Sequence, residues 1–334
     1  MSEKEVESRK LGVEKTLDGL PGAIPQLSTN RAQLHLTPNQ RSWLRFRRNK
    51  PALLCLVFLA LLAPLVAAWP LVAPYAANAI TDEQFQPPIW KHWFGTDVHG
   101  RDLLTRVFYG ARVSLLVGVV GAGVALVIGV TWGAVSGYVG GRLDGAMMRF
   151  VDVIYSMPSI IFLIVLLTTL RATVAKWLIN WFGPEAAPKS HLLLLVIGLG
   201  ALSWLPMARI VRGQVLSLRQ RAFVDASRAL GASHARILWH HILPNVWGIV
   251  IVYLTLTVPS VILYESFLSY LGLGIQPPMA SWGSLVAEGA AQINPVQIYW
   301  WLVVFPATTL VLTLLALNFV GDGLRDAFDP KGQT

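Results

Sequence analysis

The sequence predicts an all-α membrane protein with six transmembrane helices, and three observations lead to this fold class. Of its 334 residues, 54% are hydrophobic and only 13% are charged, whereas about a quarter of the residues in a soluble domain are charged. The mean hydropathy of the chain is +0.55. Its apolar residues gather in six runs, each long enough to cross a bilayer as a helix. These runs cover residues 52–72, 113–135, 148–170, 191–210, 246–268 and 299–320.

The chain up to the end of the first span divides into two segments. Residues 1–40 mix both signs of charge, contain no apolar signal-peptide core and predict a flexible cytoplasmic tail. Residues 41–72 combine the basic juxtamembrane run RSWLRFRRNK with the first transmembrane helix. Basic residues beside a span orient it and contact lipid headgroups, so we expect the N-terminus in the cytoplasm. The single cysteine, Cys55, excludes a disulfide within the chain.

Residues 73–112 are polar and predict an extracytoplasmic loop. Four apolar residues near its end are spaced as on one helix face: Leu103, Leu104, Val107 and Phe108. This spacing favours a short amphipathic helix at the membrane interface. Asp97 and Asp102 have the look of a catalytic carboxylate pair. The favoured interpretation is structural, in which they cap the turn and pair with Arg101, Arg106 or Arg112.

Residues 113–334 predict a five-helix core. The second span carries Gly129, Gly133 and Gly137, a spacing that places small residues on one helix face and lets a neighbouring helix approach closely. A tight cytoplasmic turn is expected after it, in the segment GYVGGRLDG. Its paired glycines resemble a phosphate cradle only superficially, because the GxxxxGKS/T pattern occurs nowhere in the chain. The sequence therefore predicts no ATPase site of that kind, and it assigns no catalytic residue.

Four residues inside apolar runs are candidates for the transport pathway or its gate: Asp152, Pro158, Pro259 and Glu265. An acidic residue within a span is a functional candidate by default. Asp152, however, lies near a span end with Arg149 one turn earlier, which favours a local ion pair over a proton relay. Glu265 suits either a peptide's α-amino group or the polar groups of the turn at 266–274, and the structural role is favoured. Pro158 is expected to kink the third span.

The most unusual polar segment between two spans is VDASRALGASHARILWHHILPN, residues 224–245. It is basic and helix-prone, with Gly231 near its middle and a Leu-Pro-Asn stop at its end. This composition predicts two short helices with a bend at Gly231. Asp225 is placed to cap or charge-stabilise the first helix. Because loops between membrane helices are usually short, a long helical loop indicates a docking element.

The distribution of basic residues predicts which side of the membrane this loop occupies. With both termini on one side, fifteen Lys and Arg residues lie near the spans on that side and seven on the other. The positive-inside rule then places both termini and the loop at 224–245 in the cytoplasm. The outer loop at 272–290, which is expected to contain a short re-entrant or interfacial helix, carries no basic residue.

The loop at 224–245 resembles the cytoplasmic loop of ATP-binding-cassette (ABC) importer permeases. The pattern is an acid, two small residues, a glycine four residues later and a Leu-Pro pair. Here Asp225 replaces the usual Glu and Ser227 replaces the second Ala. The segments FGTDVHGRDLLTRVFYGARVSL, SGYVGGRLD, ARIVRGQVLSLR, ESFLSYLGLG and GDGLRDAFDP resemble the C-type subunit of dipeptide and oligopeptide importers. SWLPMARIVRGQVLSL and LNFVGDGLRDAFDPK are most similar to the oligopeptide branch.

The resemblance implies a type I ABC importer permease fold in the bacterial inner membrane, with a coupling-helix loop that contacts a cytoplasmic ATPase. The residues that it implicates in coupling are Asp225, Ala226, Ser227, Arg228, Gly231, Ala232, Leu243 and Pro244. The implied partners are a B-type permease subunit, two cytoplasmic ATPases, an extracytoplasmic peptide-binding protein and membrane lipid. ATP and Mg²⁺ are used by the ATPases, and no cofactor is expected on this chain.

Several rival functions are weaker. His240 and His241 are adjacent and therefore point about 100° apart on a helix, which makes them poor joint ligands for a metal ion. No nucleophile-elbow pattern indicates a hydrolase. The basic charge follows the membrane topology, so nucleic-acid binding is not expected. An ion-coupled secondary transporter would need charged groups near the membrane midplane. Within the ABC family, dipeptides, metal chelates and peptide-like compounds remain alternative substrates.

Overall fold

Six helices are long and apolar enough to cross a membrane, as the hydropathy predicts. The computed structural model describes residues 38–186 and 189–328, so the predicted flexible tail at 1–40 lies outside the described residues except for 38–40. Within the described ranges, the six are α4 (Lys50–Val72), α5 (Leu103–Val139), α7 (Ser159–Phe182), α8 (Lys189–Arg219), α11 (Leu243–Tyr270) and α13 (Trp301–Phe328). The prediction of an all-α protein with six spans is confirmed.

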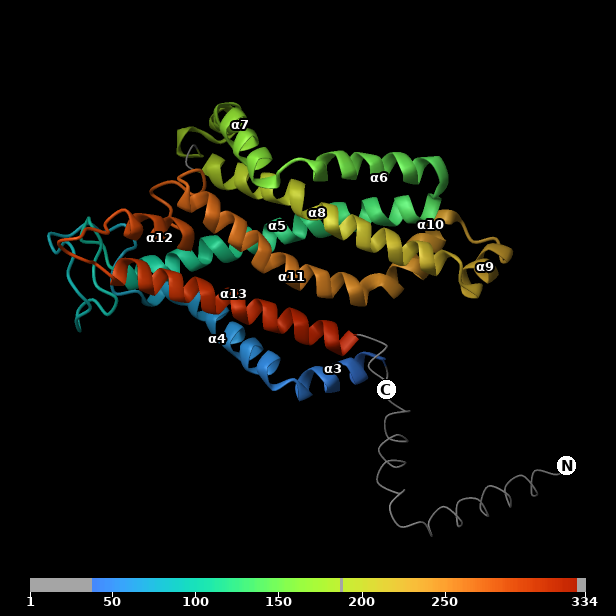
Figure 1. Ribbon diagram of the computed structural model, residues 1–334, viewed down its shortest axis with the longest axis horizontal. Coiled ribbons are helices and arrows are strands. Elements are labelled where there is room, and N and C mark those ends of the chain that lie inside the picture. Colours follow the sequence, from blue (N-terminus) through green and yellow to red (C-terminus); the bar gives the residue numbers. More distant parts are fainter. Residues whose placement is uncertain (1–37, 187–188, 329–334) are drawn as a thin grey trace, which may run out of the picture.

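Shorter helices lie at the ends and on one side of the elongated bundle (Figure 1). They are α3 (Pro38–Arg48), α6 (Gly141–Ser156), α9 (Ala222–Ala229), α10 (His234–Arg236) and α12 (Trp282–Ala290), with a 3₁₀ turn at Pro184–Ala186 and a π-helical turn at Ile237–Ile242. Figure 1 shows α12 at one end of the long axis and α9 near the other. These are called the α12 end and the α9 end below. The α12 end also holds the loop at 73–102.

The predicted glycine face of α5 packs against α8 along the middle of the bundle. A β-carbon at Gly129 would lie 2.7 Å from Cβ of Met207, and one at Gly137 would lie 2.8 Å from the carbonyl oxygen of Arg212. At Gly133, between them, the carbonyl oxygen of Ala208 would lie closer still. Larger side chains would force the two helices apart, so these glycines allow α5 and α8 to pack closely.

The prediction that the third span is a single kinked helix is wrong. The chain forms two helices, α6 and α7, that are separated at Met157 and Pro158. Proline disfavours a helical conformation in the residue before it, which explains a break here instead of a kink. Among the residues of α6, only Asp144 and Val151 are buried, and both Gly140 and Gly141 at its other end have positive φ. α6 is therefore a helix with few buried residues, and the chain is not helical on either side of it.

The start of the second span is also corrected. Leu103, Leu104, Val107 and Phe108 do not form a separate interfacial helix, because they are the first turns of α5. Asp102 caps this helix, with its carboxylate accepting a hydrogen bond from the backbone N–H of Thr105 at 2.8 Å. Leu103 and Val107 are buried against α12 and α13, and that burial holds the turns in the bundle. The predicted loop at 73–112 accordingly ends at Asp102.

The Leu-Pro-Asn stop predicted at the end of the loop is likewise wrong, because the helix continues through it into α11. Pro244 has no N–H to bond to His240, and the chain adapts through the π-helical turn just before it. The side-chain amide of Asn245 donates a hydrogen bond to the carbonyl oxygen of His241 at 2.6 Å. The helical segment therefore runs from His234 to Tyr270.

The short helix expected within 272–290 is confirmed as α12. Ser281 and Ser284 form a reciprocal capping box at its start. Trp282 is fully buried, and its indole N–H donates a hydrogen bond to the carbonyl oxygen of Val107 at 3.2 Å. α12 therefore belongs to the packed bundle and does not lie on its surface.

Candidate functional site

The exposed loop at the α9 end begins with a helix that stops in a defined way. α9 ends in a Schellman motif, in which the N–H of Ala232 bonds to the carbonyl of Ser227 at 3.1 Å and the N–H of Gly231 bonds to that of Arg228 at 2.9 Å. Gly231 has φ +79°, a left-handed conformation that glycine adopts without strain. No atom lies within 4 Å of the position that a β-carbon there would take. The predicted bend at Gly231 is present, and its surroundings are open.

The eight residues predicted for coupling divide by exposure. Asp225, Ala226, Arg228, Gly231 and Pro244 are exposed, Ser227 and Ala232 are half-buried, and Leu243 is buried. Arg228 donates to the carboxylate of Asp225 at 3.1 Å, an exposed pair within the first helix. Asp225 lies in the first turn without capping it, so it acts there only through its charge. Leu243 belongs to the core, and the other seven residues are at least partly exposed.

Two exposed apolar residues of this surface were missed by the sequence reasoning. Leu230 is 89% exposed and Phe223 is 40% exposed, at the two ends of α9. Exposed apolar side chains on a polar loop are typical of interaction sites. The signal available in the sequence was Leu230 itself, an apolar residue directly before the glycine that ends the helix.

The base of the loop is fixed to the helices beneath it. Val224 and Ile237 are fully buried in a core cluster that also contains residues of α5, α8 and α11. The hydroxyl of Tyr138, on α5, lies 2.9 Å from Nδ1 of His234. Arg219 donates to the carbonyl oxygen of Tyr138 at 2.8 Å. A force on α9 is therefore carried directly to α5, α8 and α11.

An ion pair joins α6 to α8 near the same end. Arg212 donates two hydrogen bonds to the carboxylate of Asp144, at 2.5 Å and 2.6 Å, and the hydroxyl of Ser136 donates a third. The Arg212 guanidinium lowers the pKa of Asp144 below its ordinary value, with a smaller contribution from Ser136. The carboxylate is therefore ionised at neutral pH and holds α6 against α8.

A second pair joins the same helices closer to the middle of the bundle. Asp152 accepts a hydrogen bond from Nη2 of Arg209 at 2.7 Å, so its partner is not the predicted Arg149. The Arg209 guanidinium carbon also lies 4.3 Å from the centre of the Tyr155 ring. Both members of the ion pair are exposed, with side-chain exposures of 40% for Arg209 and 59% for Asp152. These three residues are called the α6 latch below.

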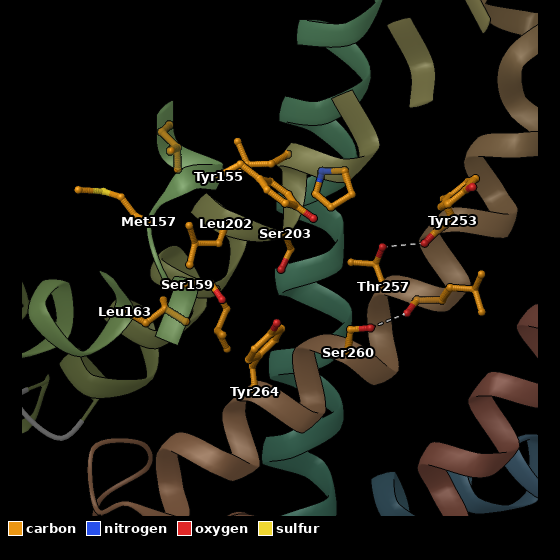
Figure 2. A pocket seen from close by; sticks show the side chains of 15 residues that line it. Tyr155, Met157, Ser159, Leu163, Leu202, Ser203, Tyr253, Thr257, Ser260 and Tyr264 are labelled. Carbon is orange, nitrogen blue, oxygen red and sulfur yellow. Dashed lines mark hydrogen bonds between the residues drawn. The ribbon is translucent and has the colours of Figure 1, made fainter. Parts of the chain in front are cut away.

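The α6 latch borders a cavity of about 420 Å³ between the α6–α7 break, α8 and α11 (Figure 2). Its lining residues include Tyr155, Ser203 and Tyr264, which come from three different helices. The cavity is also lined by Met157 and Ser159, on either side of Pro158. The lining is supplied by α6, α7, α8 and α11, together with Met157 in the α6–α7 break. Pro259 and Glu265 do not line the cavity, although the neighbouring residues on α11 do.

Glu265 is completely buried and joins α5 to α11 and, through Ser114, to the start of α12. Its carboxylate accepts hydrogen bonds from the hydroxyls of Ser114 at 3.0 Å, Ser269 at 2.7 Å and Ser266 at 3.3 Å. Ser114 in turn accepts a hydrogen bond from the backbone N–H of Trp282 at 3.2 Å. This geometry matches the structural alternative considered for Glu265.

Charged residues at the α12 end form a buried network. Asp97 pairs with Arg101 and Arg106 at 2.7 Å each, as the structural interpretation predicts. Arg106, only 3% exposed, also donates to Glu288 of α12 at 2.6 Å and 3.1 Å. The second aspartate, Asp102, lies 2.9 Å from Nδ1 of the buried His92. Among the described residues, no group of three or more His, Cys, Asp or Glu side chains is suited to a metal ion.

Comparison with known proteins gives consistent matches. Residues 129–332 match the family of the binding-protein-dependent transport system inner membrane component, and residues 37–88 match the N-terminal TM domain of oligopeptide transport permease C. The oligopeptide transport system permease protein OppC of Haemophilus influenzae is 45% identical over 296 residues, covering 86% of each chain. The dipeptide transport system permease protein DppC of Bacillus subtilis is 42% identical over 298 residues, covering 89% of this chain and 87% of its own.

Among solved structures, a chain of the MetNI methionine ABC transporter in inward facing conformations is 20% identical, with a TM-score of 0.49. The likeness covers 67% of this chain and 97% of that one.

Proposed function

Since the chain belongs to the family of binding-protein-dependent transport system inner membrane components, we propose that it is the permease subunit of an ATP-driven peptide importer that forms half of the translocation pathway. The observation that carries the proposal is the loop at the α9 end. It presents an exposed helix whose base is buried among three long helices. An exposed helix anchored in this way suits a chain whose helices are moved by a separate ATPase. Peptide is proposed as substrate because the relatives are named for oligopeptide and dipeptide transport.

The α9 end is proposed to face the cytoplasm, with both termini on that side. The support for this orientation is charge, because the positive-inside rule favours the cytoplasm for a cluster of basic residues. The arginines that lie at this end include Arg212, Arg219, Arg221, Arg228 and Arg236. The proposed partners are a B-type permease subunit, two ATPases that use ATP and Mg²⁺ at the α9 end, and a peptide-binding protein at the α12 end. Leu230 and Phe223 are proposed as apolar contacts to the ATPase, alongside the predicted residues from Asp225 to Ala232.

The function is tested by reconstituting the chain with its partner subunits in liposomes and measuring uptake of a radiolabelled tripeptide. We expect uptake only with ATP inside, at the ATPase face, and the loaded binding protein outside. A catalytically inactive ATPase is the control and is expected to abolish uptake. Uptake by this chain without ATPases, driven by an ion gradient, would instead support a secondary transporter and refute the proposal.

The α6 latch is proposed as a gate on the α9 side of the cavity. α6 has few buried residues and is flanked by the glycine pair Gly140–Gly141 and by the break at Pro158, so it can swing when its contacts to α8 weaken. Tyr155 links the latch to the cavity that it lines. Asp152 and Pro158 thereby take gating roles, whereas Pro259 and Glu265 are proposed as packing residues of α11.

Replacing Asp152 with asparagine is expected to raise ATP hydrolysis in the absence of peptide by up to about fivefold. An exposed ion pair contributes about 0.2–1 kcal/mol, and its loss shifts the population toward the released position of α6 by the corresponding factor. Basal hydrolysis by the reconstituted complex measures this change. The exchanged pair, Asp152→Arg with Arg209→Asp, is the control and should restore low hydrolysis. Unchanged basal rates in both Asp152→Asn and Arg209→Gln would contradict the gate.

A further inference from the structure

We propose that the cavity between the α6–α7 break, α8 and α11 is a binding site for the backbone of an extended peptide during its passage. This inference rests on the proposed function and adds the site and the chemistry by which the substrate is held. The cavity lies near the middle of the spans. Ser203 is fourteen residues into α8, which has 31, and the lining residues Leu256 and Thr257 lie at the midpoint of α11. Its volume of about 420 Å³ is within the range of sites that enclose small organic ligands.

Three hydroxyl groups from three helices converge on this space. Figure 2 shows the hydroxyls of Tyr155, Ser203 and Tyr264 pointing into it. None of the three has a hydrogen-bond partner among the described residues, and none is sealed away as a buried unpaired group. By contrast, Thr257 and Ser260 on the same wall already donate to backbone carbonyl oxygens of α11, at 2.7 Å and 3.1 Å. The hydroxyl of Ser159, which also lines the cavity, has no partner within the described ranges either, so the cavity offers at least four free groups that can each donate and accept a hydrogen bond.

The rest of the lining decides which ligand class suits these hydroxyls. All fifteen lining residues belong to the described part of the chain, and none is charged. A peptide backbone carries neutral donors and acceptors in alternation, which matches hydroxyls that serve as either. A lipid chain would leave all three hydroxyls unpaired, and a bare ion would meet neither a charge nor a ring of carbonyl oxygens. Uncharged walls also predict that neither acidic nor basic peptide side chains are rejected.

Replacing Tyr264 or Tyr155 with phenylalanine is expected to lower ATP-driven uptake of trialanine by about two- to tenfold, the factor that loss of one neutral hydrogen bond corresponds to. The same loss is expected for Ala-Glu-Ala and Ala-Lys-Ala, because the contact is to the backbone. Phenylalanine keeps the ring, so the Arg209 contact and the packing are preserved. The matched control is Tyr270→Phe, an exposed tyrosine of α11 that does not line the cavity.

A charge placed in the cavity gives a second, independent measurement. In Ser203→Asp, uptake of Ala-Glu-Ala relative to Ala-Lys-Ala should fall about tenfold or more against the wild-type ratio, because like charges in one site repel. The ratio cancels the preferences of the binding protein and any general loss of folded complex. Labelling of a thiol in the cavity gives a third measurement. The double variant Cys55→Ser, Ser203→Cys moves the only thiol of the chain to position 203. Trialanine supplied with its binding protein should slow the labelling of this thiol by a hydrophilic thiol reagent.

Two results separate the possible failures. Normal uptake in both phenylalanine variants, together with an unchanged charge ratio in Ser203→Asp and no protection of Ser203→Cys, would overturn the cavity as a peptide site while leaving the importer intact. Absence of ATP-driven peptide uptake in the wild-type complex would overturn the proposed function and this inference with it.

Discussion

Replacing Gly231 with glutamate in the reconstituted complex is expected to lower peptide uptake about tenfold or more while ATP hydrolysis continues. Gly231 ends the exposed helix α9 and follows Leu230, the most exposed apolar residue of the loop. A glutamate there brings an unpaired charge to the surface proposed to contact the ATPase. Burial of such a charge costs several kcal/mol, and each 1.4 kcal/mol is a factor of ten in binding. Uptake and hydrolysis measured on the same liposomes test the separation of the two activities.

Two control variants distinguish bulk and charge from backbone strain. Gly231→Asn keeps the left-handed conformation accessible and adds no charge, so it should retain most of the coupling. Gly231→Ala meets no neighbouring atom in this chain and carries only a strain of about 1–2 kcal/mol. A glutamate variant in which uptake still follows hydrolysis as in the wild type would refute the docking role of the loop. Equal uncoupling in all three variants would assign the effect to the backbone instead.

The helix at the start of the loop at 224–245 could be predicted from the sequence because its signals are local. A polar, helix-prone segment between two apolar runs, with Gly231 near its middle, was sufficient to predict α9 and its termination. The second predicted helix failed because Pro244 suggested a stop. In the structure, burial of Ile237, Ile242 and Leu243 among α5 and α8 holds those residues in a helix that continues into α11. Tertiary packing of this kind overrides a local breaker, and a single sequence does not reveal it.

The cavity could not be predicted from the sequence, for a different reason. Tyr155, Ser203 and Tyr264 are separated by more than forty residues along the chain, and each is unremarkable in its own helix. Only the break before Pro158, which ends α6 and redirects α7, brings the three helices together around a space. The sequence predicted a kink there and an ion pair for Asp152. It named Arg149 as the partner because helical spacing reveals only neighbours on the same helix, whereas Arg209 comes from α8.

The charged residues of the α12 end were easier to interpret. Asp97 and Asp102 were predicted to cap and to pair, and the structure confirms both roles. Glu288 was not foreseen because it is supplied by α12, far along the chain. Its carboxylate completes the shell around Arg106, which ties the loop at 73–102, α5 and α12 into one unit at the face proposed for the binding protein.

Replacing Arg106 with alanine is expected to destabilise the chain by about 3 kcal/mol, the lower end of the cost of removing one partner from a buried ion pair, because Arg101 still pairs with Asp97. Arg106 is 3% exposed and is shared by Asp97 and Glu288, so its removal leaves two negative charges at the α12 end with Arg101 alone to pair with both. Lysine is expected to restore only part of the loss, because it cannot reproduce the two-pronged contact to Glu288. Denaturant unfolding of the purified chain in detergent micelles measures the effect.

The matched control is Arg228→Ala, which removes the exposed pair with Asp225 and should cost at most about 1 kcal/mol. Because the penalty in Arg106→Ala comes from the stranded charges, adding Glu288→Gln to that variant should recover part of the stability, and the two substitutions should not be additive. An Arg106→Ala chain that unfolds at the wild-type denaturant concentration would contradict the network as the fastening of the α12 end. Recovery in the double variant would show that charge balance, and not the volume of the arginine side chain, holds the loop, α5 and α12 together.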